Sequence, residues 1–211
     1  MAVITPTITT DNPHDYRQYL ELLACFSEGV HIDFADGVFA PTSLLPLDKA
    51  WRHDDLITHA HVMYQDPLAV IDDIIALEAD MVILHAESEN IKEALERLSE
   101  QGIRTGIALL PETSVSDLQD LDLDELFDHV LVFAGHLGYQ GGTADFSQVA
   151  KVTALRAAYP DVEIGWDGGI NDSNARELAD AGVDILNVGG YIRRAENPKK
   201  AYESLNALLQ S

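Results

Sequence analysis

Short runs of apolar and β-branched residues recur along the whole chain, with more polar segments between them. Runs that stay apolar at successive positions are typical of strands buried on both faces, as in a parallel sheet. The pattern predicts strands over residues 3–8, 30–34, 58–63, 81–86, 105–110, 129–135, 162–168 and 184–190.

Amphipathic stretches with helical spacing lie between these runs. The apolar positions recur every three to four residues, which places them on one face of a helix. Gly102 and Gly182 stand where two of these helices should end, and Asn197 followed by Pro198 is a favourable helix start. The spacing predicts helices over residues 14–26, 89–102, 173–184 and 197–209.

Eight strands alternating with helices, without a linker rich in Pro, Gly or Ser, indicate a closed (β/α)8 barrel, also called a TIM barrel. We expect residues 1–211 to form one such domain. The alternative is a doubly wound open sheet, but no G-x-G-x-x-G follows the first strand, which disfavours a dinucleotide-binding version. In a barrel, chemistry is expected at the C-terminal ends of the strands.

The charge of the chain narrows the range of partners. Asp and Glu number 36 against 13 Lys and Arg, which gives a formal net charge of −23. Nucleic acids and anionic membranes require clustered Lys and Arg, so neither is expected as a partner. The densest acidic stretch, residues 117–128, is either a solvated helix face or loop, which general experience favours, or a cation site. A surface adapted to high salt is a further hypothesis for the acidity.

The chain carries none of the usual signals for export or membrane insertion. Its first residues lack the basic start and apolar run of a signal peptide, and no segment approaches the ~18 apolar residues of a membrane span. Cys25 is the only cysteine, so no disulfide can form within the chain. We therefore expect a soluble, cytoplasmic protein.

Four polar residues interrupt the apolar runs at or near their C-terminal ends. His31 and Asp33 alternate and so point to the same face of the second strand. His61 lies in the third strand and Asp167 closes the seventh. In a barrel these side chains converge on the mouth, where two imidazoles and two carboxylates suit a divalent transition metal. Each residue alone has a simpler structural explanation, but an ionised carboxylate near a core needs a partner.

Glycines gather at the ends of the last three strands. Barrels commonly bind phosphate with the loops after strands seven and eight, and glycine lets the backbone approach the anion closely. These could also be ordinary turns, but three sets on neighbouring strands favour a phosphate site. No lysine is close to them in sequence, so we expect binding largely through backbone dipoles. The glycines are Gly138, Gly141, Gly142, Gly168, Gly169, Gly189 and Gly190.

These segments resemble the ribulose-phosphate 3-epimerase family from residue 4 to the C-terminal helix. The family pattern H-x-D-x-M-D-G-x-F-x-P-N resembles HIDFADGVFAPT at 31–42, and P-S-I-L-S resembles PTITT at 6–10. Further similar segments are HVMYQDP at 61–67, HAES at 85–88, GIALLPETSV at 106–115 and GWDGGI at 165–170.

The resemblance implies a barrel of the ribulose-phosphate-binding type, with one divalent ion (Zn, Fe, Mn or Co) held by His31, Asp33, His61 and Asp167. It implies that Asp33 and Asp167 exchange the proton at C3 of a phosphorylated sugar, converting D-ribulose 5-phosphate to D-xylulose 5-phosphate. Thr7 matches a family serine that could contact a substrate hydroxyl. Met63 matches a methionine that would keep water out. We also expect a homo-oligomer.

The chain departs from the family pattern at positions that the resemblance places around the substrate. Ala35 replaces a methionine, and the loop after strand six reads GHLGYQGG from Gly135, which puts His136 where the family has Glu. His136 could approach the substrate phosphate. A serine of the phosphate site becomes glycine, and Trp166 stands beside Asp167. These changes bear on the identity of the sugar more than on the reaction type.

Three alternatives follow from these departures. The protein could act on a different ketose phosphate, or it could be a catalytically silent barrel that binds sugar phosphates for regulation. Retention of both carboxylates counts against the silent barrel. A related decarboxylase or hexulose-phosphate synthase would need a D-x-K-x-x-D array, and the corresponding strand has no lysine.

Overall fold

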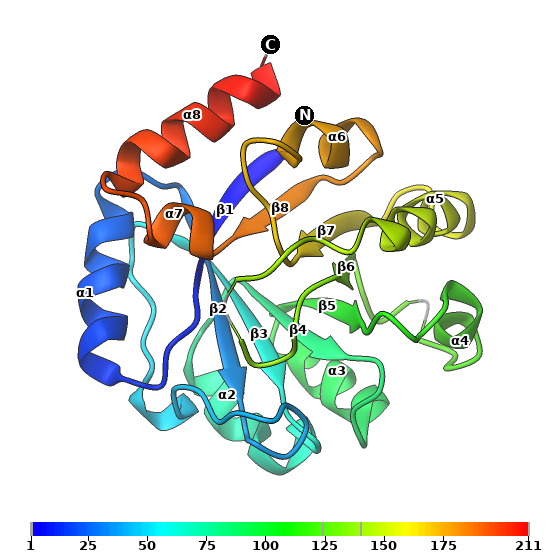
Figure 1. Ribbon diagram of the computed structural model, residues 1–211. Helices are drawn as coiled ribbons and strands as arrows, with labels where there is room; N and C mark the ends of the chain where they lie inside the picture. The colour runs from blue at the N-terminus through cyan, green and yellow to red at the C-terminus, as the bar shows by residue number, and fades with distance from the viewer. Residues whose placement is uncertain (1, 124, 140, 211) are drawn as a thin grey trace.

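The computed structural model describes residues 2–123, 125–139 and 141–210. Within these residues, eight strands close into a barrel in which each strand runs parallel to its neighbours (Figure 1). Each predicted run corresponds to one strand, so the predicted (β/α)8 barrel is confirmed and the doubly wound alternative is wrong. The strands are Val3–Ile8 (β1), Gly29–Ala35 (β2), Ile57–Met63 (β3), Met81–His85 (β4), Arg104–Leu109 (β5), His129–Phe133 (β6), Glu163–Asp167 (β7) and Ile185–Val188 (β8).

Helices follow the strands and cover the outside of the barrel, except α7, which lies inside the outer ring near the end of β8 (Figure 1). The four helices that the spacing predicts are present as α1, α3, α6 and α8. The α-helices are Pro13–Ala24 (α1), Ile71–Ala76 (α2), Ile91–Glu100 (α3), Val115–Gln119 (α4), Val149–Ala158 (α5), Ala175–Asp180 (α6), Gly190–Arg193 (α7) and Pro198–Gln210 (α8). Short 3₁₀ turns occupy Leu47–Lys49, Pro67–Val70 and Phe146–Gln148.

Helix ends coincide with the expected signals. The side chain of Asn12 accepts hydrogen bonds from two backbone N–H groups of the first turn of α1. Asn197 caps α8 in a similar way by accepting from the N–H of Lys200, at 3.0 Å. Gly102 and Gly182 follow α3 and α6 with φ of 74° and 105°, a conformation that side chains other than glycine rarely adopt.

Apolar clusters stabilise the barrel: one outside the strands, one inside them, and a small third cluster of Ala35, Ala40, Leu44 and Met63. The largest lies between strands and helices, where fully buried residues such as Leu20, Leu95 and Leu178 pack, and burial of one such side chain stabilises the fold by roughly 1.5–3 kcal/mol. Trp166 belongs to this outer layer and donates its indole N–H to the carbonyl of Gly168, at 3.0 Å. It therefore faces away from Asp167, on the opposite side of the strand.

The second apolar layer lies inside the barrel and is small: it consists of Met81, Ile83, Ala108 and Leu131. Most other inward positions are polar. Five buried histidines, His31, His59, His61, His85 and His129, belong to the strands that the structure describes. An interior this polar needs hydrogen-bond partners or ligands.

The loops after β2 and β6 meet over one side of the barrel mouth. Thr42 donates a hydrogen bond to the carbonyl of Gly138, at 2.6 Å. Gly138 has φ of 77°, and a Cβ at this position would collide with the Thr42 hydroxyl. The contact therefore requires glycine at this point of the β6 loop.

The structure favours a solvated helix face or loop, and not a cation site, for the acidic stretch at 117–128. Helix α4 ends at Gln119, and the described acidic residues that follow are exposed. Asp124 lies outside the described residues. Among the described residues, the His, Cys, Asp and Glu groups close enough to share a metal ion lie elsewhere, at the barrel mouth. None of the helices formed by the described residues combines the length and apolar character that crossing a membrane requires.

Candidate active site

The structure brings together the four polar residues that the sequence places at strand ends. His31, Asp33, His61 and Asp167 each offer one ligand atom, and these atoms lie within 4.8 Å of one another. Asp33 and His61 are direct register partners on β2 and β3, and His31 is two residues earlier on the same face of β2. Three strands therefore hold the cluster, so its side chains lose little conformational freedom when a ligand binds to them.

Each carboxylate turns one oxygen toward both imidazoles. Asp33 Oδ1 lies 3.1 Å from His61 Nδ1 and 3.3 Å from His31 Nε2. Asp167 Oδ2 lies 3.9 Å from each of the same two nitrogens. The second oxygen of Asp33 accepts a 2.6 Å hydrogen bond from the hydroxyl of Thr9. Two carboxylates and two imidazoles thus surround one point.

A chain of contacts behind His61 orients its ring. His61 Nε2 lies 2.9 Å from His85 Nε2, and His85 Nδ1 lies 3.3 Å from Glu87 Oε2. Burial lowers the pKa of His85 to about 4, so this ring is neutral at pH 7. Burial raises the pKa of Glu87, but its hydrogen bonds to His85 and Thr113 outweigh burial and lower it, so Glu87 is ionised.

The contacts from Glu87 through His85 determine which nitrogen of His61 carries the proton. An ionised Glu87 accepts only, so the proton of His85 sits on Nδ1 and His85 Nε2 must accept. The hydrogen bond then needs a proton on His61 Nε2, which leaves Nδ1 of a neutral His61 with a lone pair facing Asp33 Oδ1. Two lone pairs 3.1 Å apart repel each other, and a cation bound between them, or a second proton on the ring, relieves that repulsion.

His31 points to the same conclusion. Its side chain is fully buried, and neither ring nitrogen has a hydrogen-bond partner among the described residues. Buried polar atoms are normally paired, so Nε2 is available to a ligand. Imidazole with carboxylate is a donor set that suits Zn²⁺, Fe²⁺, Mn²⁺ or Co²⁺. The residues present therefore fit a divalent transition metal.

The environment separates the acidities of the two carboxyl groups. Burial, and then the neighbouring carboxylate of Asp33, raise the pKa of Asp167 above its usual range. Burial also raises the pKa of Asp33, but the adjacent imidazoles of His31 and His61 outweigh burial and hold the pKa below its usual range. Two buried carboxyl groups with divergent pKa values are typical of sites that move protons.

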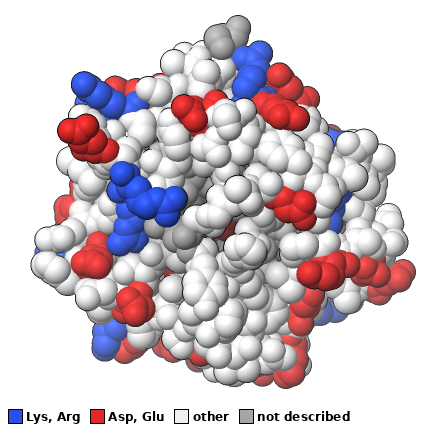
Figure 2. All heavy atoms as spheres, in the orientation of Figure 1, with Lys and Arg blue, Asp and Glu red and all other residues white. Residues whose placement is uncertain are grey.

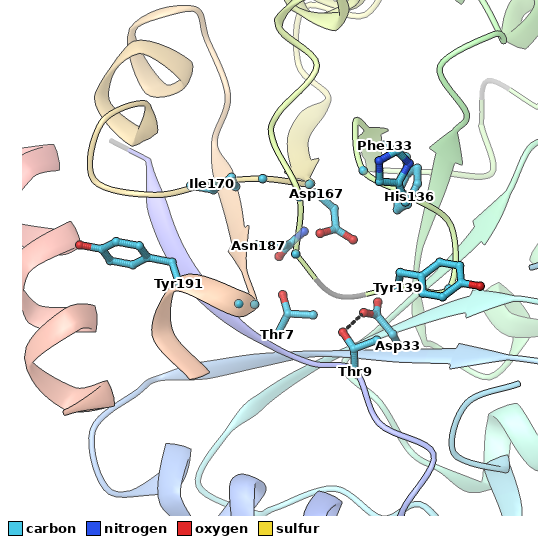
Figure 3. A pocket seen from close by; sticks show the side chains of 18 of the residues that line it. Thr7, Thr9, Asp33, Phe133, His136, Tyr139, Asp167, Ile170, Asn187 and Tyr191 are labelled. Carbon is cyan, nitrogen blue, oxygen red and sulfur yellow. Dashed lines mark hydrogen bonds between the residues drawn. The ribbon is translucent and has the colours of Figure 1, made fainter. Parts of the chain in front are cut away.

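A cavity of about 130 Å³ opens from this cluster toward the loops after β6, β7 and β8 (Figure 3). Asp33 and Asp167 line it together with Thr7 and Met63. The glycines of the proposed phosphate site also line it: Gly138, Gly141, Gly142, Gly168, Gly169, Gly189 and Gly190. His136 lines both this cavity and a second hollow along the β6 loop.

Two of these glycines have a packing role besides any contact with an anion. Gly168 and Gly169 have φ of 127° and 67°. A Cβ on Gly168 would collide with the backbone of Gly135, and one on Gly169 would collide with that of Ala144. Glycine is therefore what allows the β7 loop to lie directly against the β6 loop.

Arg194 adds a positive side chain to a site where the sequence predicts binding largely through backbone dipoles. Its guanidinium lies beside Gly141 and Gly190, where a Cβ on either residue would crowd it. It is the only Lys or Arg lining the cavity among the described residues. Figure 2 shows Lys and Arg gathered over α7 beside the central hollow, while Asp and Glu scatter more widely.

Thr9, Asn187 and Arg194 are among the lining residues that the sequence analysis did not single out. Asn187 carried a signal, because it is a polar residue inside an apolar run, as His31 and Asp33 are. Thr9 stands where the family motif has leucine. Arg194 meets a loop more than fifty positions away, and no local spacing indicates that contact.

Comparisons with known proteins agree with the geometry. The model of the "Ribulose-phosphate 3 epimerase family" matches residues 3–193. A ribulose-phosphate 3-epimerase of Chlamydia pneumoniae is 30% identical over 181 residues, covering 81% of this chain and 78% of its own. One from Schizosaccharomyces pombe is 28% identical over 212 residues, covering 97% and 92%.

Solved structures with low sequence identity share the fold. A 3-hexulose-6-phosphate synthase superposes with a TM-score of 0.74 at 18% identity, covering 99% of this chain and 100% of its own. A 3-keto-L-gulonate-6-phosphate decarboxylase from Vibrio cholerae gives a TM-score of 0.74 at 11% identity, covering 99% and 97%. These similarities show that the fold is shared, and they carry no information about the activity of this chain.

Proposed function

The chain belongs to the ribulose-phosphate 3-epimerase family, and from that membership we propose that it is a metal-dependent 3-epimerase of a ketose phosphate, with D-ribulose 5-phosphate and D-xylulose 5-phosphate as the substrate pair. The observation that carries the proposal is the meeting of His31, Asp33, His61 and Asp167 at one end of the cavity. Family membership makes the protein an isomerase of carbohydrates. The sugar is the part that we propose.

The two carboxylates perform the proton transfer in this proposal. Asp33 projects from β2 and Asp167 from β7, and both line the cavity (Figure 3). One takes the proton from C3 of the sugar, and the other returns a proton to the opposite face, which inverts that carbon. In the reverse direction the two exchange roles. The opposed pKa shifts suit a pair in which one member is ionised while the other is protonated.

A divalent ion held by the two histidines and the two aspartates would stabilise the negative charge that develops on the sugar oxygens. His61 and His31 contribute neutral nitrogen donors, and Glu87 and His85 hold His61 in the required tautomer. Met63 and Phe133 line the cavity beside the cluster, and their apolar side chains exclude water from the reacting carbon.

The opposite end of the cavity suits the phosphate. Glycines of three loops offer close approach to backbone N–H groups, and the Arg194 guanidinium supplies a positive charge in a chain with a net charge of −23. Guanidinium groups bind phosphate oxygens in a bidentate manner. The related decarboxylases and synthases are not favoured, because no lysine lines this cavity within the described residues.

Solvent exchange tests the proposal directly. The protein is incubated in D₂O with D-ribulose 5-phosphate and Mn²⁺, Fe²⁺, Co²⁺ or Zn²⁺, and loss of the C3 proton signal is followed by NMR. We expect exchange and conversion to D-xylulose 5-phosphate with at least one of these ions. Exchange with another ketose phosphate alone would redirect the proposal to that sugar. Binding without exchange of any ketose phosphate would favour the catalytically silent barrel.

A further inference from the structure

Asn187 has a buried side chain without a partner at the centre of the site. It is 2% exposed, and neither its Oδ1 nor its Nδ2 makes a hydrogen bond within the described part of the chain. It is the register partner of Asp167 on β7 and of Thr5 on β1. A carboxamide buried in this way is costly to the free protein, so its presence needs an explanation.

The neighbouring Thr7 shares this condition. Its side chain lies inside the barrel, 2% exposed, and its Oγ1 is also without a partner among the described residues. Figure 3 shows the Asn187 carboxamide between Asp167 and Thr7, directed into the cavity that all three residues line. A donor, an acceptor and a hydroxyl are therefore presented together to whatever occupies this space.

A second asparagine shows that the fold can pair a buried carboxamide outside the cavity. Asn174 is 8% exposed and is fully engaged: its Oδ1 accepts from the N–H of Asn171 at 2.8 Å, and its Nδ2 donates to the carbonyl of Gly169 at 3.0 Å. The fold thus satisfies a buried carboxamide where the role is structural, and leaves Asn187 open toward the cavity.

We propose that Asn187 is a specificity-determining residue that hydrogen-bonds a hydroxyl group of the sugar chain, on the carbon between the reacting carbon and the phosphate. This rests on the proposed function. Asn187 lies beside Asp167, which would act at the reacting carbon, and it precedes Gly189 and Gly190, which line the phosphate end, by two and three residues. In a pentulose 5-phosphate that reacts at C3, this hydroxyl is the one on C4. A neutral carboxamide suits a hydroxyl, because it can both donate and accept.

The test compares the wild type with Asn187→Leu, which has a similar volume and no polar atoms. For D-ribulose 5-phosphate we expect kcat/KM to fall by about 10–100-fold, because the hydroxyl would be left unpaired in a desolvated site. For the 4-deoxy analogue, wild type and variant should differ by no more than about 2-fold. The melting temperature of Asn187→Leu should equal or exceed that of the wild type, since an unpaired carboxamide is removed.

Asn174→Leu is the matched control for stability. It removes a carboxamide that has both partners, and its melting temperature should fall by several degrees, roughly 2–4 °C for each kcal/mol lost. Equal losses of Asn187→Leu on the two sugars, or a fall in its melting temperature like that of Asn174→Leu, would assign Asn187 a structural role.

A third measurement separates failure of this inference from failure of the proposed function. If the wild type catalyses no exchange, the dissociation constants of D-ribulose 5-phosphate and its 4-deoxy analogue are measured by calorimetry for both proteins. Preference for the hydroxylated sugar that disappears in Asn187→Leu would uphold the role of Asn187 without turnover. Absence of binding, or a preference that survives the substitution, would overturn it.

Discussion

His85 Nε2 lies 2.9 Å from Nε2 of His61, although the two residues stand on different strands and neither ring has access to solvent. His85 in turn contacts the ionised Glu87, so a carboxylate directs the tautomer of His61 through an intervening imidazole. Relays of this kind raise the basicity of a metal-ligating histidine and hold its ring in place.

His85→Leu should therefore weaken metal binding. Without the acceptor on His85, the Nε2 proton of His61 loses its partner in a buried environment, and the ring can take the other tautomer. We expect metal affinity to fall about 10–100-fold, measured by competition with a chelator of known affinity. His14 is exposed on α1, so His14→Leu should leave the affinity unchanged. Equal affinities of His85→Leu and wild type would refute the relay.

Asp33→Asn and Asp167→Asn should each abolish C3 exchange, lowering kcat by at least about 10³-fold. Each carboxamide has nearly the shape of the carboxylate it replaces but cannot take up the C3 proton at neutral pH. Each variant should also bind the metal more weakly. Asp48→Asn, on an exposed turn, serves as the control. Substantial exchange in either site variant would show that a different group moves the proton.

Thr9→Val tests the 2.6 Å hydrogen bond from Thr9 to Asp33 Oδ2. Valine keeps the shape of the side chain and removes the donor, so the Asp33 carboxylate is left free to rotate. We expect kcat to fall about 10-fold with KM nearly constant, because the change concerns the proton-transferring group and not the sugar-binding end. The control Thr153→Val, on the exposed face of α5, should match the wild type. A rise in KM without a change in kcat would instead place Thr9 in substrate binding.

Arg194→Met should change KM and leave kcat nearly constant, the opposite of the result expected for Thr9→Val. The guanidinium stands beside the lining glycines Gly141 and Gly190, so its loss should raise KM about 10–100-fold and leave kcat within a few-fold. Inorganic phosphate should inhibit the wild type competitively and the variant more weakly. Lys200→Met makes the same change of charge on the exposed surface of α8. If both variants raise KM equally, the effect is one of net charge and not of a contact with Arg194.

The fold was predictable because its signals are local. Strands buried on both faces and helices with one apolar face are each visible within about ten residues of sequence. The four residues of the candidate metal site were also visible in the sequence, because each is a polar residue within an apolar run. Their proximity then follows from the parallel direction of the strands, which places all their C-terminal ends at one mouth.

The remainder of the site depends on contacts that no local pattern encodes. The role of His85 arises from the meeting of two rings on neighbouring strands, and Arg194 reaches a loop that precedes it by more than fifty positions. Asn187 differs, because its signal was present in the run ILNV but was weak against three apolar neighbours. Only the burial of its unpaired carboxamide distinguishes it from a packed residue.

The opposite end of the barrel carries an acid-sensitive ion pair. Glu163 lies 2.8 Å from the Arg104 guanidinium, and His129 Nδ1 lies within 3.8 Å of the same carboxylate oxygen. Burial raises the pKa of Glu163, but these two neighbours outweigh burial and lower it to about 2. Because the pKa in the folded state is below that of the unfolded chain, Glu163 stabilises the fold above about pH 4.5, and this contribution is lost as the pH falls toward 2.

Glu163→Gln should therefore lower the free energy of unfolding by about 1–2 kcal/mol at pH 7, a figure that allows for solvent screening of this partly exposed pair. The difference from the wild type should shrink as the pH falls from about 4.5 toward 2, as measured by urea unfolding at a series of pH values. Glu203→Gln breaks an exposed pair with Lys199 on α8 and should change stability little at any pH. A deficit of Glu163→Gln that stays constant across this range would mean that the side chain stabilises the barrel by packing and not by its charge.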